Sequence, residues 1–218
     1  MSEFPRTERN QIKRLPARGQ YDKDTIYRIL DEALVCHVGF IQDDQPVVIP
    51  TLYARRDDRL ILHGARASRM LKSIQAGHPV CVTVTLVDGL VVARSVFHHS
   101  INYRSVVVFG RGALIESDEE KLQALEGLTE RILRGRWRDA RKPTRQELDA
   151  TTVVSITIES ASAKVRTGPP IDDEGDYQLP VWAGVLPIRQ QAFVPINDPR
   201  LGRDIPVPDY ITDYDGPR

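Results

Sequence analysis

The stretch Pro79–Gly112, PVCVTVTLVDGLVVARSVFHHSINYRSVVVFGRG, combines two runs of β-forming residues, a polar loop and a third β run. Residues 80–87 alternate between bulky apolar side chains and smaller ones, as in a strand with one buried face. Asp88-Gly89 is a dipeptide typical of a two-residue hairpin turn, so we predict a strand on each side of it. Gly110 and Gly112 interrupt the third run, where glycine marks a bend or bulge that curls a sheet. The stretch therefore predicts a curved antiparallel ribbon.

The rest of the chain supplies strands and helices around this ribbon. Further β runs, separated from their neighbours by polar turns, cover residues 34–41, 47–54, 60–63 and 152–165. Capping side chains followed by helical apolar spacing predict helices at residues 23–33, after Ser68, at 118–133 and after Thr144. In the third of these helices, Leu122, Leu125, Leu128 and Ile132 are expected to point inward. Because strands and helices do not alternate regularly, we predict a mainly β fold of six or seven strands, an antiparallel barrel with flanking helices.

The length of 218 residues predicts one domain with irregular ends. Residues 1–20 are polar and contain two prolines, so we expect an N-terminal arm rather than a packed element. Residues 21–168 are expected to form the barrel domain. Residues 169–218 are rich in proline and sustain no periodicity, and they are expected to form an irregular extension that packs on the barrel or on a partner subunit.

The composition limits which binding partners and which cellular compartment we expect. The formal net charge is +0, so the chain has no overall bias toward nucleic acid or an anionic membrane. No apolar run approaches the roughly 20 residues of a membrane helix, and the charged N-terminus lacks the apolar core of a signal peptide. Cys36 and Cys81 are far apart and form no CxxC motif, which favours two free thiols in a reducing cytoplasm.

The first candidate site is the segment His63–Lys72, HGARASRMLK. A strand ends, Gly64 lets the backbone turn, and a helix begins behind Ser68. Arg69 and Lys72 are three residues apart and share one face of that helix. Backbone N–H groups at a helix start and nearby cations attract anions, so a phosphate site is one interpretation, and a capped helix with a solvated basic face is the other.

The second candidate is the loop Phe97–Arg104, FHHSINYR. His98 and His99 are adjacent, so in an extended segment they point to opposite sides and cannot easily share a metal ion. No metal is expected there. A flat aromatic ligand or a proton-transfer role suits His, Tyr and Arg better, and a polar interface loop is the equal alternative.

The other motifs are weaker evidence for a functional site. Gly110-Arg111-Gly112 lacks the third glycine and the following helix of a dinucleotide fingerprint. The basic run Arg131–Arg145 could face nucleic acid, but cations at a helix C-terminus are also favoured by the helix dipole, and we prefer that interpretation. Cys36-His37 could in principle ligate haem iron, although within a Val-Gly-Phe strand we expect both residues to be buried and structural.

Together these segments resemble the pyridoxamine 5'-phosphate oxidase-like FMN-binding split-barrel superfamily, and within it the flavin-nucleotide-binding, nitroimidazole-resistance-type branch. The resemblance rests on five segments in the expected order, which together with the residues between them span most of residues 5–190: YDKDTIYRILDEALVCHVGF, PTLYARRDDRLILHGARASRMLKSI, the Pro79–Gly112 stretch, SAKVRTGPPIDD and LPVWAGVLP. The C-terminal Arg-x-His pattern of true pyridoxamine phosphate oxidases is not found, which argues against that substrate.

The resemblance implies an antiparallel split β-barrel that binds FMN, in a homodimer with the cofactor at the subunit interface. Ser68, Arg69 and Lys72 would hold the phosphate, and Pro50, Thr51, Leu52 and Tyr53 would contact the isoalloxazine ring. The remaining implied cofactor contacts are His63, Thr83, Thr85, His99, Asn102, Arg104 and, by stacking, Trp182. His63, His98 and Tyr103 are the implied catalytic residues.

The expected function is that of an FMN-dependent oxidoreductase. It would use a reduced nicotinamide to reduce a small acceptor, such as a nitroaromatic or quinone-like compound, and would need neither nucleic acid nor a membrane. A second hypothesis is a non-catalytic flavin or haem binder that acts as a carrier or sensor. A third is a nucleic-acid or protein-interaction module that uses the basic run.

Overall fold

The structure is a computed structural model that describes residues 2–202 and 205–217. These residues divide into two compact units. Unit 1 contains residues 2–33, 81–109 and 159–190. Unit 2 contains residues 34–80, 110–158, 191–202 and 205–217. Each unit is described by itself below.

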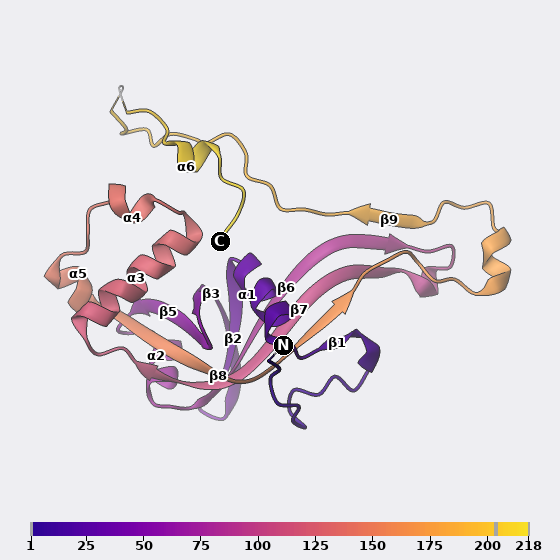
Figure 1. The fold of residues 1–218 in the computed structure, drawn as a ribbon, viewed down its shortest axis with the longest axis horizontal. Coiled ribbons are helices and arrows are strands. Elements are labelled where there is room, and N and C mark those ends of the chain that lie inside the picture. The colour runs from indigo at the N-terminus through magenta and orange to yellow at the C-terminus, as the bar shows by residue number, and fades with distance from the viewer. Residues whose placement is uncertain (1, 203–204, 218) are drawn as a thin grey trace. The chain divides into compact units, whose positions relative to one another are not determined.

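Strands dominate the fold, and the prediction of a mainly β protein with flanking helices is confirmed. The strand order is β3-β2-β6-β7-β8-β5-β4, with β1 paired to β8 and β9 paired to β6 (Figure 1). Every pairing with a defined register is antiparallel. The strands of the described residues are β1 (Gly19–Gln20), β2 (Val35–Gln42), β3 (Gln45–Leu52), β4 (Ala54–Arg56), β5 (Arg59–Ala65), β6 (Pro79–Val92), β7 (Ser100–Leu114), β8 (Thr151–Arg166) and β9 (Gly184–Pro187).

The predicted helices form, and side-chain caps begin them. Asp22, Ser68, Ser117 and Thr144 each accept a backbone N–H bond from the first turn of the helix that follows. The helices are α1 (Lys23–Glu32), α2 (Arg69–Gln75), α3 (Asp118–Ile132), α4 (Arg136–Asp139), α5 (Arg145–Ala150) and α6 (Asp209–Thr212), with short 3₁₀ turns η1 (Pro16–Arg18), η2 (Val96–His98) and η3 (Glu174–Gln178). No helix in residues 2–202 and 205–217 combines the length and the apolar character needed to cross a bilayer.

The predicted hairpin turn at Asp88-Gly89 is wrong, because β6 runs without interruption through both residues. Gly89 does not have a positive φ, which a type I′ turn requires at both central residues. A Cβ on Gly89 would lie 2.9 Å from the Leu186 carbonyl oxygen of β9, which pairs with β6 here. The glycine therefore permits a close strand approach rather than a turn. The chain reverses instead around η2, where Val96 and Phe97 are exposed.

Asp88 is held in the strand by an ion-pair network within unit 1. Arg104 of β7 donates from Nε and Nη2 to the two Asp88 carboxylate oxygens at 2.9 and 2.7 Å. The same guanidinium also bonds both carboxylate oxygens of Glu32 at the end of α1. These hydrogen bonds raise the Arg104 pKa, with the Asp88 bond as the main cause. A side chain used in this way cannot cap a turn.

Two other strand boundaries differ from the predicted ones. The expected strand at residues 47–54 is split into β3 and β4 at Tyr53, whose side chain is fully buried. Gly64 does not break β5, which continues to Ala65 in register with Thr151 of β8. The turn between β2 and β3 forms where predicted, and Asp43 and Asp44 both have the positive φ of a type I′ turn.

The buried face of α3 is rotated from the predicted one. Leu128 is buried as expected, but its buried neighbours are Ala124 and Arg131, while Leu122, Leu125 and Ile132 are half-buried. Much of the basic run that follows is paired within unit 2. Arg141 bonds Glu147 at 2.7 and 2.8 Å, and Arg145 bonds Asp118 and Asp149. These pairs neutralise much of the charge that suggested nucleic acid.

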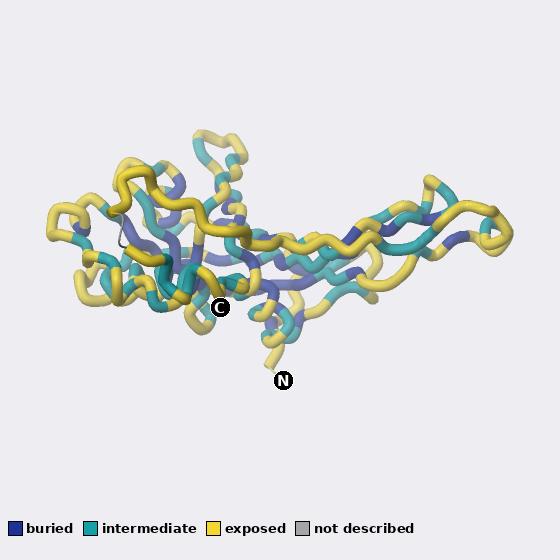
Figure 2. The backbone as a smooth tube through the Cα atoms, turned by 90° about the horizontal axis from the view of Figure 1, so that it is seen from above, coloured by how far each residue is buried: buried dark blue, intermediate teal, exposed yellow. Residues whose placement is uncertain are grey.

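Some of the first residues of the chain pack within unit 1, whereas much of the C-terminal segment is exposed. In unit 1, Phe4 and Asn10 are buried, and Asn10 Nδ2 donates to the Ala161 carbonyl of β8 at 3.0 Å. The segment from residue 169 onward divides between the two units and contributes β9 and α6. The residues from 186 to 202 are exposed almost throughout (Figure 2). The domain boundaries 1–20, 21–168 and 169–218 stay a prediction.

Two glycines of β7 allow the backbone of unit 2 to pack closely. A Cβ on Gly110 would overlap the Thr157 carbonyl oxygen of β8, and a Cβ on Gly112 would overlap the Ile74 side chain of α2. The predicted role of these glycines in shaping the sheet thus has a steric basis, because no other residue fits without moving a strand or a helix.

We predict that Gly110→Ala lowers the free energy of unfolding by about 1–3 kcal/mol or more, because the added methyl group meets a backbone carbonyl that cannot move aside. Gly127→Ala is the matched control, since this helical glycine has no atom within 4 Å of a Cβ. It should stabilise the protein by about 0.5–1 kcal/mol through helix propensity. Urea denaturation followed by circular dichroism measures both, and equal stability of Gly110→Ala and the wild type would contradict the packing argument.

Candidate functional site

The start of α2 presents a group of exposed cations in unit 2, which we call the α2 basic cluster: Arg66, Arg69 and Lys72. Ser68 Oγ accepts the Leu71 N–H at 3.3 Å, and Ser68 N–H donates to the Ala65 carbonyl at 2.9 Å. Met70, Leu71 and Ile74 anchor the other face of the helix in the core. The side chains of the cluster are therefore held toward solvent by the burial of their apolar neighbours.

The α2 basic cluster lacks the carboxylate partners that other cations of this protein have. Within the described residues, no Asp or Glu side chain lies within ion-pair distance of its three members. By contrast, Arg104 and Arg145 each bond two carboxylates. Three neighbouring cations without an internal counter-charge repel one another, so an anion at this position is electrostatically favoured.

His63 lies on β5, five residues before Ser68. Its ring is half-buried, and its Nδ1 is buried without a hydrogen-bond partner in the described part of the chain. Burial lowers the His63 pKa, because the charged imidazolium loses hydration. An orphaned buried nitrogen costs free energy unless a bound group satisfies it. His63 therefore has the properties of a ligand contact.

The segment from Pro50 to Tyr53 divides into an exposed and a buried part. Pro50 and Leu52 are exposed on β3, the end strand of the sheet, and Thr51 is half-buried. The β4–β5 register pairs Ala54 with Ile61, so the chain at Tyr53 lies one residue beyond that pair, close to the strand that carries His63. The Tyr53 side chain is fully buried, so any ligand contact of this residue would have to come from its backbone.

Arg131 was considered only as the first residue of the basic run and not as part of a ligand site. Its guanidinium lies over the Tyr53 ring at 4.8 Å, and its side chain is buried beneath α3. The signal that could have found it is helical spacing, because Ala124, Leu128 and Arg131 follow one stripe. A buried cation on an aromatic face fixes the ring at the base of the β3–β4 connection.

The two threonine candidates lie on β6 in unit 1. Thr83 Oγ1 donates to the Val106 carbonyl at 3.0 Å, and Thr85 is exposed. The Thr83 hydroxyl therefore already donates one hydrogen bond within the sheet. Their predicted contacts with a ribityl chain stay a prediction.

Most candidates in the Phe97–Arg104 loop have partners inside unit 1. His98 Nε2 lies 3.4 Å from an Asp173 carboxylate oxygen, and His99 Nε2 lies 3.2 Å from the Ala93 carbonyl oxygen. Asn102 is buried, accepts a bond from Arg166 and donates to the Gly168 carbonyl at 3.1 Å. In this part of the molecule these contacts brace the hairpin end, and a role toward a cofactor stays a prediction.

Tyr103 and Trp182 complete the predicted set. Tyr103 is half-buried on β7, and Trp182 is 68% exposed just before β9. A Cβ on Gly184 would lie 2.9 Å from Trp182 Cζ2, so the indole ring is folded against the start of β9. Arg104, as described, is held by Asp88 and Glu32. In the described chain, no group of three or more His, Cys, Asp and Glu side chains could hold a metal ion.

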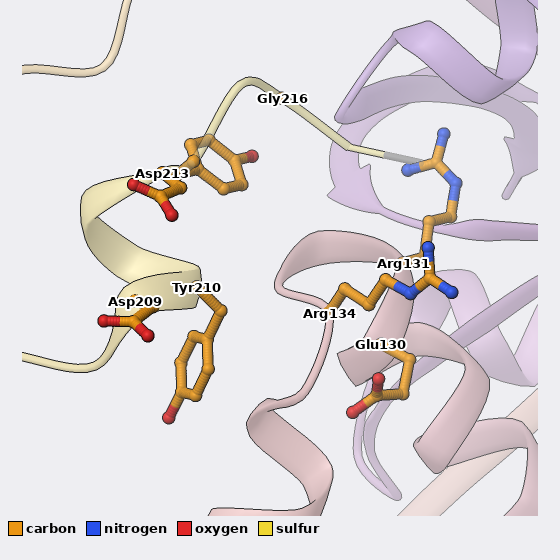
Figure 3. A pocket seen from close by; sticks show the side chains of 8 residues that line it. Glu130, Arg131, Arg134, Asp209, Tyr210, Asp213 and Gly216 are labelled. Atoms are coloured by element: carbon orange, nitrogen blue, oxygen red, sulfur yellow. The ribbon is translucent and has the colours of Figure 1, made fainter.

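One cavity of about 260 Å³ lies between α3 and α6 in unit 2. Figure 3 shows Arg131 and Arg134 on one side and Tyr210 on α6 facing them, with the carboxylates of Asp209 and Asp213 turned away. None of its lining residues is a predicted site residue.

Comparison with known proteins identifies the family. A model of the family described as pyridoxamine 5'-phosphate oxidase matches residues 22–165, about two thirds of the chain. The chain therefore belongs to that family, whose members have the split-barrel fold. Among curated proteins, none matches the chain.

Many solved structures are similar to this chain, and three of them bear on its function or fold. The flavocytochrome Anf3 from Azotobacter vinelandii is 41% identical, with 97% of this chain and 98% of that chain covered and a TM-score of 0.90. The FAD and heme binding protein from Mycobacterium smegmatis is 33% identical over 92% of this chain and 98% of that chain, with a TM-score of 0.87. A candidate 5-nitroimidazole antibiotic resistance protein from Bacteroides thetaiotaomicron is 24% identical over 67% and 86%, with a TM-score of 0.57, and shows the shared fold.

The lowered pKa of His63 predicts a pH dependence of stability in the cofactor-stripped protein. The unfolded chain takes up a proton near the ordinary histidine pKa of about 6.5, whereas folded His63 resists protonation. The contribution of His63 to stability is therefore fully present above pH 6.5 and is lost as the pH falls below it.

Urea denaturation at pH 8 and pH 5 should show a smaller loss of stability for His63→Gln than for the wild type. His78→Ala is the control, because His78 is exposed. An unchanged pH dependence in His63→Gln would show that the ring is not desolvated.

Proposed function

We propose that this protein is a flavin-nucleotide-binding redox protein, and that the α2 basic cluster holds the phosphate of its cofactor. The observation that carries the proposal is the exposed cluster of three cations that have no carboxylate partners within the described residues. Membership of the family, and the names of the two relatives above 30% identity, support the same class of cofactor.

The residues of unit 2 fit such a cofactor. Arg69 and Lys72 can form charge-assisted hydrogen bonds with a phosphate, and Ser68 orders the helix start that carries them. Because β3 ends the sheet, half of its backbone polar groups face away from β2. Such groups within Pro50–Leu52, where Pro50 has only a carbonyl to offer, can bond the polar edge of a flavin ring. His63 Nδ1 has no hydrogen-bond partner within the described residues, and such a ring could supply one.

FMN is the proposed flavin. A terminal monophosphate carries close to two negative charges, which suits three unpaired cations. The relative from Mycobacterium smegmatis is named for FAD, whose bridging pyrophosphate would also be attracted by these cations. Release of the cofactor by heat and its separation from standards by chromatography distinguishes the two flavins.

The bound flavin would supply the electron-transfer chemistry. The basic cluster would fix its phosphate end, and Tyr53 beneath Arg131 would keep the β3–β4 connection rigid. Because burial lowers its pKa, His63 is neutral at pH 7 and can accept a proton or a hydrogen bond. The proposed donor is a reduced nicotinamide, the proposed acceptor is a nitroaromatic- or quinone-like compound, and the proposed assembly is a homodimer with the cofactor at the interface.

Haem is the proposed second cofactor. The observation that favours it is that the relatives from Azotobacter vinelandii and Mycobacterium smegmatis, which match 97% and 92% of this chain, are named for haem or a cytochrome as well as for a flavin. A haem-and-flavin protein without turnover, acting as a carrier or sensor, is the alternative to an oxidoreductase. Steady-state oxidation of a reduced nicotinamide with and without an acceptor separates the two.

We predict that Arg69→Ala weakens flavin binding by about 10-fold to 150-fold, because one charge-assisted phosphate contact is worth roughly 1.5–3 kcal/mol. His98→Ala should have a smaller effect, since His98 is engaged with Asp173. Fluorescence titration of the stripped protein with FMN measures both affinities.

Arg56→Ala controls for the loss of one exposed positive charge elsewhere in unit 2. Equal flavin affinity in Arg69→Ala and Arg56→Ala would contradict the phosphate assignment. A wild-type protein that is colourless and cannot be loaded with FMN or FAD would contradict the proposed function itself.

A further inference from the structure

The β2–β3 hairpin of unit 2 has an unusual outer face. In an antiparallel pair, residues directly opposite each other point to the same side of the sheet. The register pairs Val35 with Leu52, His37 with Pro50, Gly39 with Val48 and Ile41 with Pro46. We call these eight residues the outer face of the β2–β3 hairpin.

This outer face is apolar and exposed. Val48 and Ile41 are 63% and 58% exposed, and Val35 and Leu52 are 42% and 39% exposed. Cys36, Val38 and Phe40, which alternate with them along β2, are buried on the opposite side. An antiparallel sheet that faces water on one side normally carries polar residues there. A contiguous exposed apolar face of this kind marks a binding surface.

His37 is the one side chain of the outer face that carries hydrogen-bonding atoms. His37 lies directly opposite Pro50, and Gly39, two residues further along β2, has no side chain. The neighbouring side chains on this face therefore cannot form a hydrogen bond with the imidazole ring. Within the described residues, no hydrogen bond or ion pair involves His37. The expectation that both residues of the Cys36-His37 dipeptide are buried is wrong for His37, which is exposed, and holds for Cys36.

The other histidines are placed differently. His78, His98 and His99 each lie within 3.4 Å of a bonding partner, namely Ser73 Oγ, Asp173 and the Ala93 carbonyl. His63 is half-buried on β5. His37 is therefore the histidine of this chain that is both exposed and without a partner in the described residues. Cys36 offers no thiolate, because burial raises its pKa to about 12 and its side chain faces the core.

We propose that the outer face of the β2–β3 hairpin is a haem-binding surface and that His37 is an axial ligand of the haem iron. The inference rests on the proposed function, which includes haem as a second cofactor. A porphyrin is a broad, flat, mainly apolar ring whose iron binds an imidazole nitrogen. The outer face offers a flat apolar strip with one exposed imidazole in it, which matches both features.

A second copy of this chain fits the face less well. It would bury the apolar residues, but it would also bury the His37 ring, and a buried ring nitrogen without a partner costs about 1–3 kcal/mol. Haem iron satisfies that nitrogen while the porphyrin covers the apolar side chains. The chemistry of His37 thus favours haem over a purely apolar protein contact.

The proposal is tested by hemin titration of the full-length protein after the haem has been removed and the flavin retained. Wild type should bind hemin with a shifted Soret band and a resonance Raman signature of histidine ligation. His37→Gly should bind hemin at least about tenfold more weakly and lack that signature, since even indirect changes at a metal site cost 10–100-fold. His78→Ala, the matched control on an exposed histidine, should behave as the wild type.

Added imidazole should restore the wild-type Soret band in His37→Gly, which a merely structural role of His37 would not allow. The His37 assignment is overturned if His37→Gly binds hemin with the wild-type affinity and spectrum, although haem binding itself then stands. If the wild type binds no hemin, the haem part of the proposed function fails together with the assignment. If Val48→Asp abolishes self-association but leaves the hemin spectrum unchanged, the outer face binds a second copy and the proposal is overturned.

Discussion

The close approach of the β7 backbone to its neighbours is the constraint on which unit 2 depends. Gly110 and Gly112 let β7 pass where any side chain would overlap Thr157 of β8 or Ile74 of α2. Ile74 is fully buried and anchors α2, so the same contact fixes the helix whose other face carries the basic cluster. The position of the candidate phosphate site is therefore a consequence of main-chain packing rather than of any polar interaction.

Charge in this protein is balanced overall but not locally. Arg104 in unit 1 and Arg141 and Arg145 in unit 2 are matched by carboxylates, so they stabilise the hairpin ribbon and the α3–α5 region without attracting ligands. The α2 basic cluster is left without such partners. The net charge of zero thus hides a local surface that attracts anions. The run Arg131–Arg145 has more basic residues than the α2 basic cluster, but its ion pairs leave it less able to bind an anion.

Signals confined to one turn were predicted well from the sequence. Asp22, Ser68 and Thr144 cap helices as expected, because a capping bond joins residues only two or three apart. The Asp88-Gly89 signal failed because its partners are distant. Arg104 takes the Asp88 carboxylate and β9 packs against Gly89, and neither contact is visible in the local pattern. Arg131 was missed for a related reason, since a charged residue at the end of an apolar stripe suggests solvent unless an aromatic ring such as Tyr53 covers it.

The sequence by itself determined the mainly β class, the caps, the basic residues around Ser68 and the family. All of these depend on residue type and short spacing, which the chain carries locally. Only the tertiary structure decided which of these residues are available. Pairing within the sheet placed His37 and the apolar residues of β3 on one exposed face, and ion pairs between distant residues occupied Arg104. Availability depends on contacts between segments far apart in the chain, and no local pattern encodes those contacts.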